Sequence, residues 1–353
     1  MNRAVQLSRR PVVAMVMIMA TACSANGTES TAADTSRLPP VVLAASGTGA
    51  LLYDPNTEVY SGYARDGRRV WTESRTGADV RCAVQCPDAV FSGARGSQVP
   101  PWSRAGAKVE KVAVSPADRQ RVVSLRSDAD AVVVEASGKG DRLVVHRTDG
   151  SVKKHAIAGA DDAVWVESPD RSVALLLFAD PELAGATMLR FTRDPGGWRA
   201  AGDGWPANGY WGGCVGVRGG PAFLTGGTGG MLSVLGPVPL RTDLPQVGEC
   251  VAGKDGGALI SRWMDGRGKP HTSIRGVDAL GRQIWSRDLQ AEAGVTADPT
   301  GAAIAVVNDG RLELLDRNGT VSGRRDDVTA ARFTETGQLV TVNAKNEVSW
   351  SAP

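Results

Sequence analysis

The sequence predicts an all-β fold, a β-propeller of four-stranded blades, because one pattern of strands and turns recurs along it. Residues 293–353 contain short apolar segments separated by Gly turns, and the pattern begins again at Ala330. A Gly turn followed closely by a β-branched residue or Trp occurs seven times, at intervals of 38–46 residues. A period in the forties that is built from strands is typical of propeller blades. The seven turn glycines are Gly67, Gly106, Gly150, Gly196, Gly236, Gly281 and Gly319.

The number of blades follows less directly from the repeat. Its period over residues 40–353 favours seven blades, whereas a count of the strands favours eight as the alternative. The last repeat, Ala330–Pro353, holds about three strands and has no Gly turn of its own. A strand at 41–45 could complete it, since ring closure protects the edges of sheets that are marginal alone.

Composition agrees with this fold and excludes some functions. The 353 residues include 43 Gly, and 42% are hydrophobic, which suits many strands joined by tight turns. The net charge is only +2, from 40 basic and 38 acidic residues, so we expect no nucleic-acid partner. After the N-terminus there is no apolar run of the length that a membrane-spanning helix needs.

The N-terminus has the three parts of an export signal. Arg3, Arg9 and Arg10 precede a short apolar run at 12–19, and Ala20-Thr-Ala-Cys23 follows. This order predicts a signal peptide. The last four residues resemble a bacterial lipobox, which implies that residues 1–23 are a lipoprotein signal and that Cys23 is lipidated. An ordinary signal peptide is the alternative, and Arg9-Arg10 leaves twin-arginine export open beside the general route.

Residues 24–39 form a small, polar segment that cannot bury enough apolar surface to become ordered. We therefore expect a flexible tether, with an r.m.s. reach of about 20–25 Å, ahead of a propeller domain at 40–353. Together with a lipidated Cys23, this predicts an exported protein anchored to the outer face of the cell membrane.

The mature chain would keep four cysteines, Cys82, Cys86, Cys214 and Cys250. An even number in an exported protein predicts disulfides. Of the three possible connectivities we favour Cys82–Cys86 and Cys214–Cys250, because the second pair occupies similar positions in consecutive blades. Buried free thiols are the alternative, and a zinc site is less favoured still.

Motifs for catalysis are missing from the sequence. The three histidines, His146, His155 and His271, have no metal-binding spacing, and neither a Gly-x-Ser-x-Gly motif nor a phosphate-binding loop occurs. We therefore expect no catalytic residue, no metal and no cofactor.

A contact surface is expected at Gly202–Gly213, where loop residues alternate with aromatic ones. Aromatic side chains on loops often anchor partners. The candidate ligand-binding residues are Trp205, Tyr210 and Trp211, and the alternative is that they fill the gap between two blades.

Two groups of repeats resemble repeats of known propeller families. The last two repeats resemble WD40-type units, although the Trp-Asp dipeptide is absent, and the endings Gly67-Arg-Arg-Val-Trp71 and Gly281-Arg-Gln-Ile-Trp285 resemble PQQ-type propeller repeats. The resemblance implies a scaffold for protein or ligand contact. We thus expect a membrane-anchored lipoprotein whose propeller binds a protein or cell-envelope ligand without catalysis. A quinoprotein-like oxidoreductase or hydrolase, and a structural assembly factor of a membrane complex, are the alternatives.

Overall fold

The structure, a computed structural model, describes most of one unit, Leu38–Pro353. Within it, residues 75–78, 84, 93–101, 106–107, 112–118, 128–129, 137–139, 161, 181–184, 203, 208–209, 227–230, 234–239 and 243–247 are not described. The expected signal peptide, Cys23 and most of the tether also lie outside the described residues. No helix in the described part is long and apolar enough to cross a membrane.

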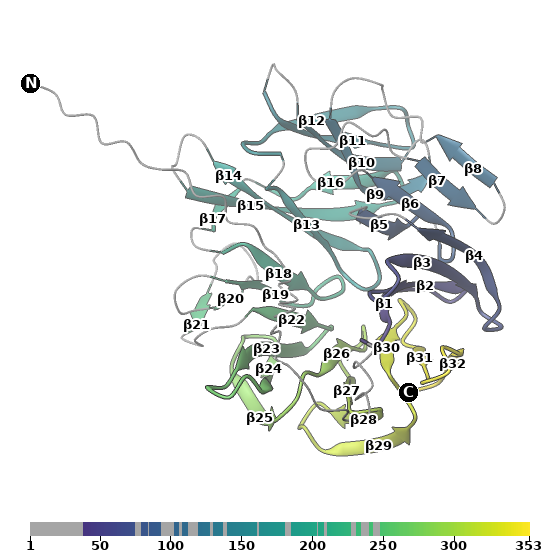
Figure 1. Cartoon of the computed structure of the whole chain (residues 1–353). Coiled ribbons are helices and arrows are strands. Elements are labelled where there is room, and N and C mark those ends of the chain that lie inside the picture. Colours follow the sequence, from purple (N-terminus) through teal and green to yellow (C-terminus); the bar gives the residue numbers. More distant parts are fainter. Residues whose placement is uncertain are drawn as a thin grey trace, which may run out of the picture. The chain divides into compact units, whose positions relative to one another are not determined.

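The described strands form eight antiparallel sheets, numbered here as blades in chain order (Figure 1). Within each blade, strands that follow one another in the sequence pair with one another. The first four blades comprise β1 (Val41–Ala45), β2 (Gly49–Asp54), β3 (Val59–Ala64) and β4 (Arg69–Ser74); β5 (Asp79–Cys82), β6 (Ala89–Ser92), β7 (Trp102–Ala105) and β8 (Lys108–Lys111); β9 (Arg119–Ser127), β10 (Asp130–Ala136), β11 (Arg142–His146) and β12 (Val152–Ala156); and β13 (Val164–Glu167), β14 (Val173–Asp180), β15 (Gly185–Asp194), β16 (Gly197–Ala200) and the added β17 (Trp205–Pro206).

Blades 5 to 7 have four strands each, and blade 8 has three. Their strands are β18 (Gly212–Val215), β19 (Ala222–Thr225), β20 (Met231–Ser233) and β21 (Leu240–Thr242); β22 (Glu249–Ala252), β23 (Gly256–Met264), β24 (Pro270–Asp278) and β25 (Gln283–Leu289); β26 (Gly294–Ala297), β27 (Ala303–Asn308), β28 (Arg311–Asp316) and β29 (Val321–Asp326); and β30 (Ala330–Phe333), β31 (Leu339–Val342) and β32 (Val348–Ser351).

The blades follow one another around a common axis, with the first strand of each blade innermost (Figure 1). The innermost strand of one blade lies against that of the next in most of the ring, and β30 of the last blade lies against β1 of the first. This arrangement is a β-propeller, so the predicted fold class is confirmed.

Ring closure differs from the expectation that residues 41–45 complete the last blade. That strand, β1, instead pairs with β2 in the first blade, so blade 8 keeps three strands. Side chains join the two blades: Trp350 Nε1 donates to Ser46 O at 3.2 Å, and Glu335 Oε1 accepts from Gly47 N at 3.1 Å. An apolar cluster between blades 1 and 8 buries the rest of the contact. Hydrophobic packing and these two hydrogen bonds therefore close the ring without backbone pairing between the two blades.

The turn glycines explain why the period favoured seven blades although the described strands form eight sheets. Five of them, Gly67, Gly150, Gly196, Gly281 and Gly319, lie between the third and fourth strands of their blades. Gly106 and Gly236 lie outside the described residues. Because blade 8 has no fourth strand, it has no such turn, and a count of turns omits it. The described strands thus form one sheet more than there are turn glycines.

Tryptophans in fourth strands connect neighbouring blades. The Trp285 ring lies over Gly276 of the paired third strand, where an added Cβ would stand 2.1 Å from ring atoms. Trp71 lies over Gly62 in the same manner in blade 1. Each indole N–H then reaches a carbonyl of the following blade. These acceptors are Pro87 O for Trp71, at 2.9 Å, and Arg317 O for Trp285, at 3.2 Å.

The hydrophobic core is divided among the interfaces between blades. The largest described cluster lies between blades 3 and 4, where the Trp165 ring contacts the rings of Phe191 and Trp198. Phe191 and Trp198 are almost fully buried. Each sheet therefore obtains its burial from its neighbours, as expected of sheets that are apolar on both faces.

Candidate functional site

The innermost strands of all eight blades enclose one cavity of about 570 Å³. Its lining includes residues of the turns that join first to second strands, among them Ser46 and residues 168–171. We call the end of the propeller that carries these turns the cavity end. The opposite end, which carries the connections between blades, such as 290–293, and the turns between second and third strands, is called the linker end.

A buried ion pair lies on one wall of the cavity. Glu167, at the end of β13, accepts from Arg171 Nε at 2.9 Å and from Trp165 Nε1 at 2.9 Å. Burial alone would raise the pKa of Glu167, but the charge of Arg171 and the hydrogen bonds outweigh it and lower that pKa below its ordinary value. The carboxylate is therefore ionised at neutral pH.

Arg171 also connects its blade to the two preceding blades. It occupies the turn 168–172 with a φ of 55°, in the left-handed region. Its Nη1 donates to Ala83 O of blade 2 at 3.0 Å, and its Nη2 donates to Leu125 O of blade 3 at 3.2 Å. Since one guanidinium supplies all these donors, the ion pair fixes the positions of three blades around the cavity.

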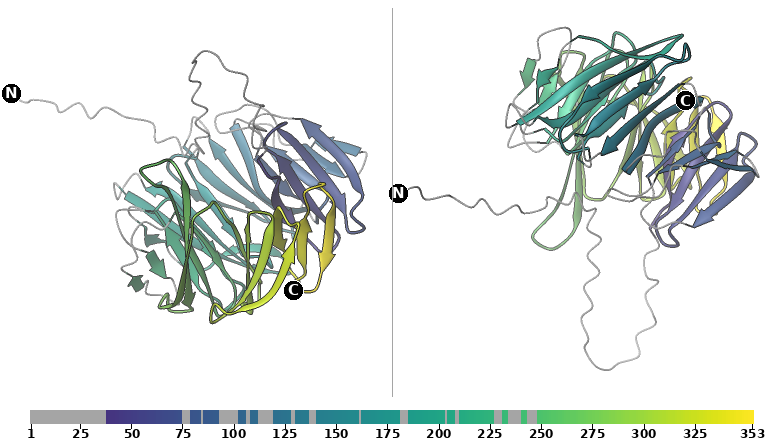
Figure 2. Two further views of the ribbon diagram at one scale, coloured as in Figure 1. Left: turned by 60° about the horizontal axis from the view of Figure 1, so that its bottom comes forward. Right: turned by 90° about the horizontal axis from the view of Figure 1, so that it is seen from above.

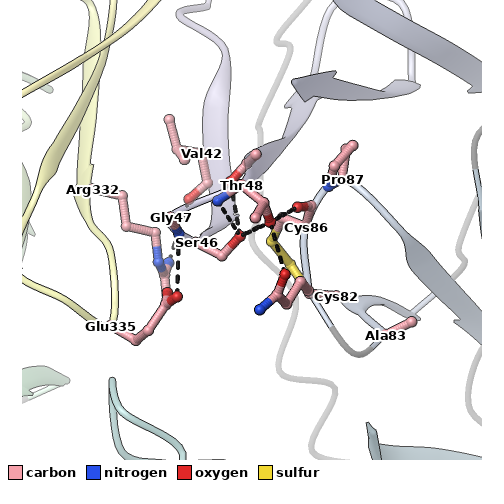
Figure 3. The surroundings of a disulfide bond; sticks show 12 residues. Val42, Ser46, Gly47, Thr48, Cys82, Ala83, Cys86, Pro87, Arg332 and Glu335 are labelled. Carbon is pink, nitrogen blue, oxygen red and sulfur yellow. Dashed lines mark hydrogen bonds between the residues drawn. A yellow bond between two sulfur atoms is a disulfide. The ribbon is translucent and has the colours of Figure 1, made fainter. Parts of the chain in front are cut away.

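A second charged pair of residues comes from blade 8 (Figure 3). The Arg332 side chain is exposed to the open space of the cavity. Its position inside the ring, among the atoms of several blades, lowers its pKa through desolvation. Its Nη1 donates to Val42 O at 3.3 Å. Glu335, three residues later, also lines the cavity and accepts the Gly47 N–H. A guanidinium and a carboxylate thus stand at the same wall.

Both disulfides lie in the cavity wall and have the favoured connectivity. Cys82 and Cys86, with Cα atoms 5.1 Å apart, close the turn after β5. Cys214 and Cys250, with Cα atoms 5.7 Å apart, join the innermost strands of blades 5 and 6. Figure 3 shows the first disulfide beside Thr48, whose Oγ1 donates to Cys86 O at 2.6 Å.

The three histidines do not line the cavity. His155 contacts the edge of the Phe191 ring, and burial lowers its pKa, while His271 lies 3.4 Å from Asp265. Among the described residues, no three His, Cys, Asp or Glu side chains are grouped as metal ligands. The described wall can thus recognise a ligand through charge and hydrogen bonds, but it offers no histidine base to a nucleophile.

The three aromatic residues of the expected contact surface have different surroundings. Trp205 and Tyr210 pack against the apolar cluster between blades 4 and 5, as the alternative of a gap-filling role proposed. Trp211 is 64% exposed and comes directly before β18, at the linker end. The structure does not bring it to the cavity, so among the three Trp211 stays the candidate for contact with a partner.

Replacing Trp205 with Ala should lower the free energy of unfolding by about 2 kcal/mol, because its ring is partly buried against the interblade cluster. Trp211→Ala should change it by less than about 0.5 kcal/mol. Urea unfolding of both variants measures the difference. Equal losses of stability would show that Trp211 also supports the fold.

Sequence reasoning missed four of the charged residues that line the cavity, Glu167, Arg171, Arg332 and Glu335. A signal existed for two of them. Glu167 ends the apolar strand Val164–Glu167, and Arg332 interrupts Ala330–Phe333. A charge in a short inner strand must face either a partner or open space inside the ring. The two turn residues carried no such signal, because charged residues are common in turns.

No family model and no curated protein matches this chain. Solved structures with a similar arrangement include apo AztD from Citrobacter koseri, with 15% sequence identity and a TM-score of 0.46, covering 84% of this chain and 91% of that one. The Neurospora crassa Pan2 WD40 domain has 13% identity and a TM-score of 0.46, covering 78% of this chain and 89% of that one. These likenesses carry no information about the function of this chain.

Proposed function

We propose that this protein is an exported, lipid-anchored propeller that binds a ligand of the cell envelope in its central cavity without catalysing a reaction. The cavity is the observation that carries the proposal. Its volume of about 570 Å³ lies in the range of small-molecule sites, and polar groups of both signs line it.

Arg332 is the residue that we expect to recognise the ligand. Among the described residues its guanidinium makes one hydrogen bond, to Val42 O. A guanidinium carries five N–H donors in a planar fork, so others remain for a ligand. Such a fork suits a carboxylate or phosphate group. Glu335 stands close by in the sequence and offers an acceptor to a cationic or hydroxyl group on the same ligand.

Export is supported by the N-terminal signal and by the two disulfides, which persist in oxidising compartments. The lipid anchor rests on the lipobox at Ala20–Cys23. Mass spectrometry of the N-terminal peptide of mature protein tests it, since lipidation adds acyl chains to Cys23.

Native mass spectrometry of protein purified from its own membranes tests the cavity. We expect a small anionic molecule on wild type, and at least a tenfold lower occupancy on Arg332→Met, because a charged hydrogen-bonding pair contributes about 1.5–3 kcal/mol. Arg311→Met is a matched control, since Arg311 pairs with Asp326 on the outside of blade 7. Wild type that carries no molecule, or equal occupancy in Arg332→Met, would contradict the proposal.

A further inference from the structure

One hairpin of blade 6 projects beyond the strands that flank it. Glu249, the first residue of β22, pairs with Ile260, yet β23 continues to Met264 before β24 returns from Pro270. Beyond β22, four residues of strand correspond to about 13 Å. On the other side, Leu289 at the end of β25 pairs with Thr272, so the hairpin projects beyond β25 by two residues of each strand. The projecting hairpin, drawn in green, is visible in the right view of Figure 2. We call residues 263–271 the hairpin tip, and it lies at the linker end.

The hairpin tip exposes apolar side chains in a fixed arrangement. Trp263 is 46% exposed and Met264 is 67% exposed, the highest value among the exposed large hydrophobic residues of the described chain. The Trp263 ring stacks on His271 of the opposite strand, with centroids 5.3 Å apart and planes at 11°. The ring is therefore held on the hairpin and does not fold back into the core.

The charges of the hairpin tip are divided between an internal carboxylate and two free cations. Asp265 Oδ1 accepts the backbone N–H groups of Arg267 and Lys269, at 2.8 and 2.9 Å, and so closes the turn. The side chains of Arg267 and Lys269 are exposed. The hairpin tip thus presents an aromatic ring, a thioether and two cations together. Such a combination of apolar and cationic side chains favours the interface of a membrane.

The chain enters the propeller at the same end. Leu38 is fixed to the turn between β2 and β3 by two hydrogen bonds: Leu38 N donates to Asn56 Oδ1 at 2.9 Å, and Asn56 Nδ2 donates to Leu38 O at 2.7 Å. The fourteen residues from 24 to 37 would span about 20 Å r.m.s. as a flexible chain. A lipid on Cys23 would thus keep the linker end close to the bilayer. Exposed Trp211 lies at this end as well.

We propose that the hairpin tip inserts into the interfacial layer of the membrane that carries the anchor. Trp263 and Met264 enter the boundary between headgroups and acyl chains, and Arg267 and Lys269 contact lipid phosphates. The linker end then faces the bilayer, and the cavity end faces away from it, open to ligands. This inference rests on the proposed lipid anchor for its orientation, but the insertion itself can be tested without the lipid.

The first test uses the mature chain with Cys23→Ser, which cannot be lipidated, and vesicles of equal parts phosphatidylcholine and phosphatidylglycerol. We expect the parent to float with the vesicles, and its partition coefficient to fall at least about tenfold in Trp263→Ser/Met264→Ser. Leu280→Ser/Ile284→Ser is the matched control, because both residues are exposed in the same blade at the cavity end. Met264→Ser alone, which leaves the ring stacking intact, should show an intermediate loss.

A parent chain that does not float, or equal losses in the two double variants, would overturn the insertion without bearing on the lipid anchor. A spin label on lipidated protein then tests the orientation. For a label at Met264→Cys, the ratio of its accessibility to oxygen over its accessibility to a water-soluble nickel complex should rise when vesicles are added. For a label at Leu280→Cys this ratio should not change. If the label at position 264 were shielded from both reagents without vesicles, the hairpin tip would instead contact a second copy of the chain. Equal accessibility ratios at positions 264 and 280 in the presence of vesicles would refute the orientation.

Discussion

Arg171→Met should lower the free energy of unfolding by about 3 kcal/mol, because it leaves Glu167 buried beside the cavity without its cation. Both side chains are more than four-fifths buried, with 18% and 16% exposure. The guanidinium also donates to the carbonyls of Ala83 and Leu125, so its removal loosens contacts of blade 4 with blades 2 and 3. Urea unfolding at neutral pH measures the loss. Arg171→Lys is the control, because it keeps the charge but not the planar fork, and it should recover only part of the stability.

The pH dependence of Arg171→Met should separate the charge of Arg171 from its packing. In wild type the pKa of Glu167 is lowered, so its contribution is present above the unfolded value of about 4.3 and is lost as the pH falls through the folded pKa. In the variant, burial acts without the neighbouring cation and favours the protonated acid. The stability difference between the two proteins should therefore shrink in acid. A constant difference from neutral to acidic pH would show that packing, and not charge, is what Arg171 supplies.

Removal of the Cys214–Cys250 disulfide should cost about 4 kcal/mol of stability, because it crosslinks positions 36 residues apart in the unfolded chain. It also joins the innermost strands of blades 5 and 6, where β18 meets β22. The variant Cys214→Ser/Cys250→Ser, unfolded in urea, gives the value.

The Cys82–Cys86 disulfide supplies the matched control for this prediction. Its cysteines are only 4 residues apart, so the loss of entropy in the unfolded chain is smaller and Cys82→Ser/Cys86→Ser should cost about 2 kcal/mol. Equal losses in the two double variants would contradict the loop-closure explanation. A reductant added to wild type should lower stability by more than either variant alone.

The local elements of this fold could be predicted because their signals are local. The turn at Asp316–Gly319 needs a Gly in the left-handed region, where Gly319 has a φ of 80°, and β29 after it alternates between half-buried and exposed residues. The same chemistry recurs at Gly67, Gly150 and Gly281, so the period and the propeller followed from it. The disulfide pairing could also be inferred, since Cys214 and Cys250 occupy similar positions in consecutive blades.

The site could not be predicted, because it is made by residues that are far apart in the sequence. Arg332 meets the Val42 carbonyl across 290 residues, and Arg171 meets Ala83 across 88. Nothing near Trp205 distinguishes it from Trp211, yet one packs between blades and the other is exposed. Neighbours in space, which decide burial, are set by the closure of the ring.

The sequence by itself determined the strand-and-turn repeat and indicated which cysteines pair, since each depends on nearby residues or on a regular interval. Tertiary structure alone decided how the ring closes and where its charges gather. The expected pairing of 41–45 with the last blade was wrong because β1 finds its hydrogen-bond partner in β2, and closure is left to Trp350, Glu335 and an apolar cluster. Strand pairing follows from local turns, whereas side-chain packing between distant blades forms only when all of them are in place.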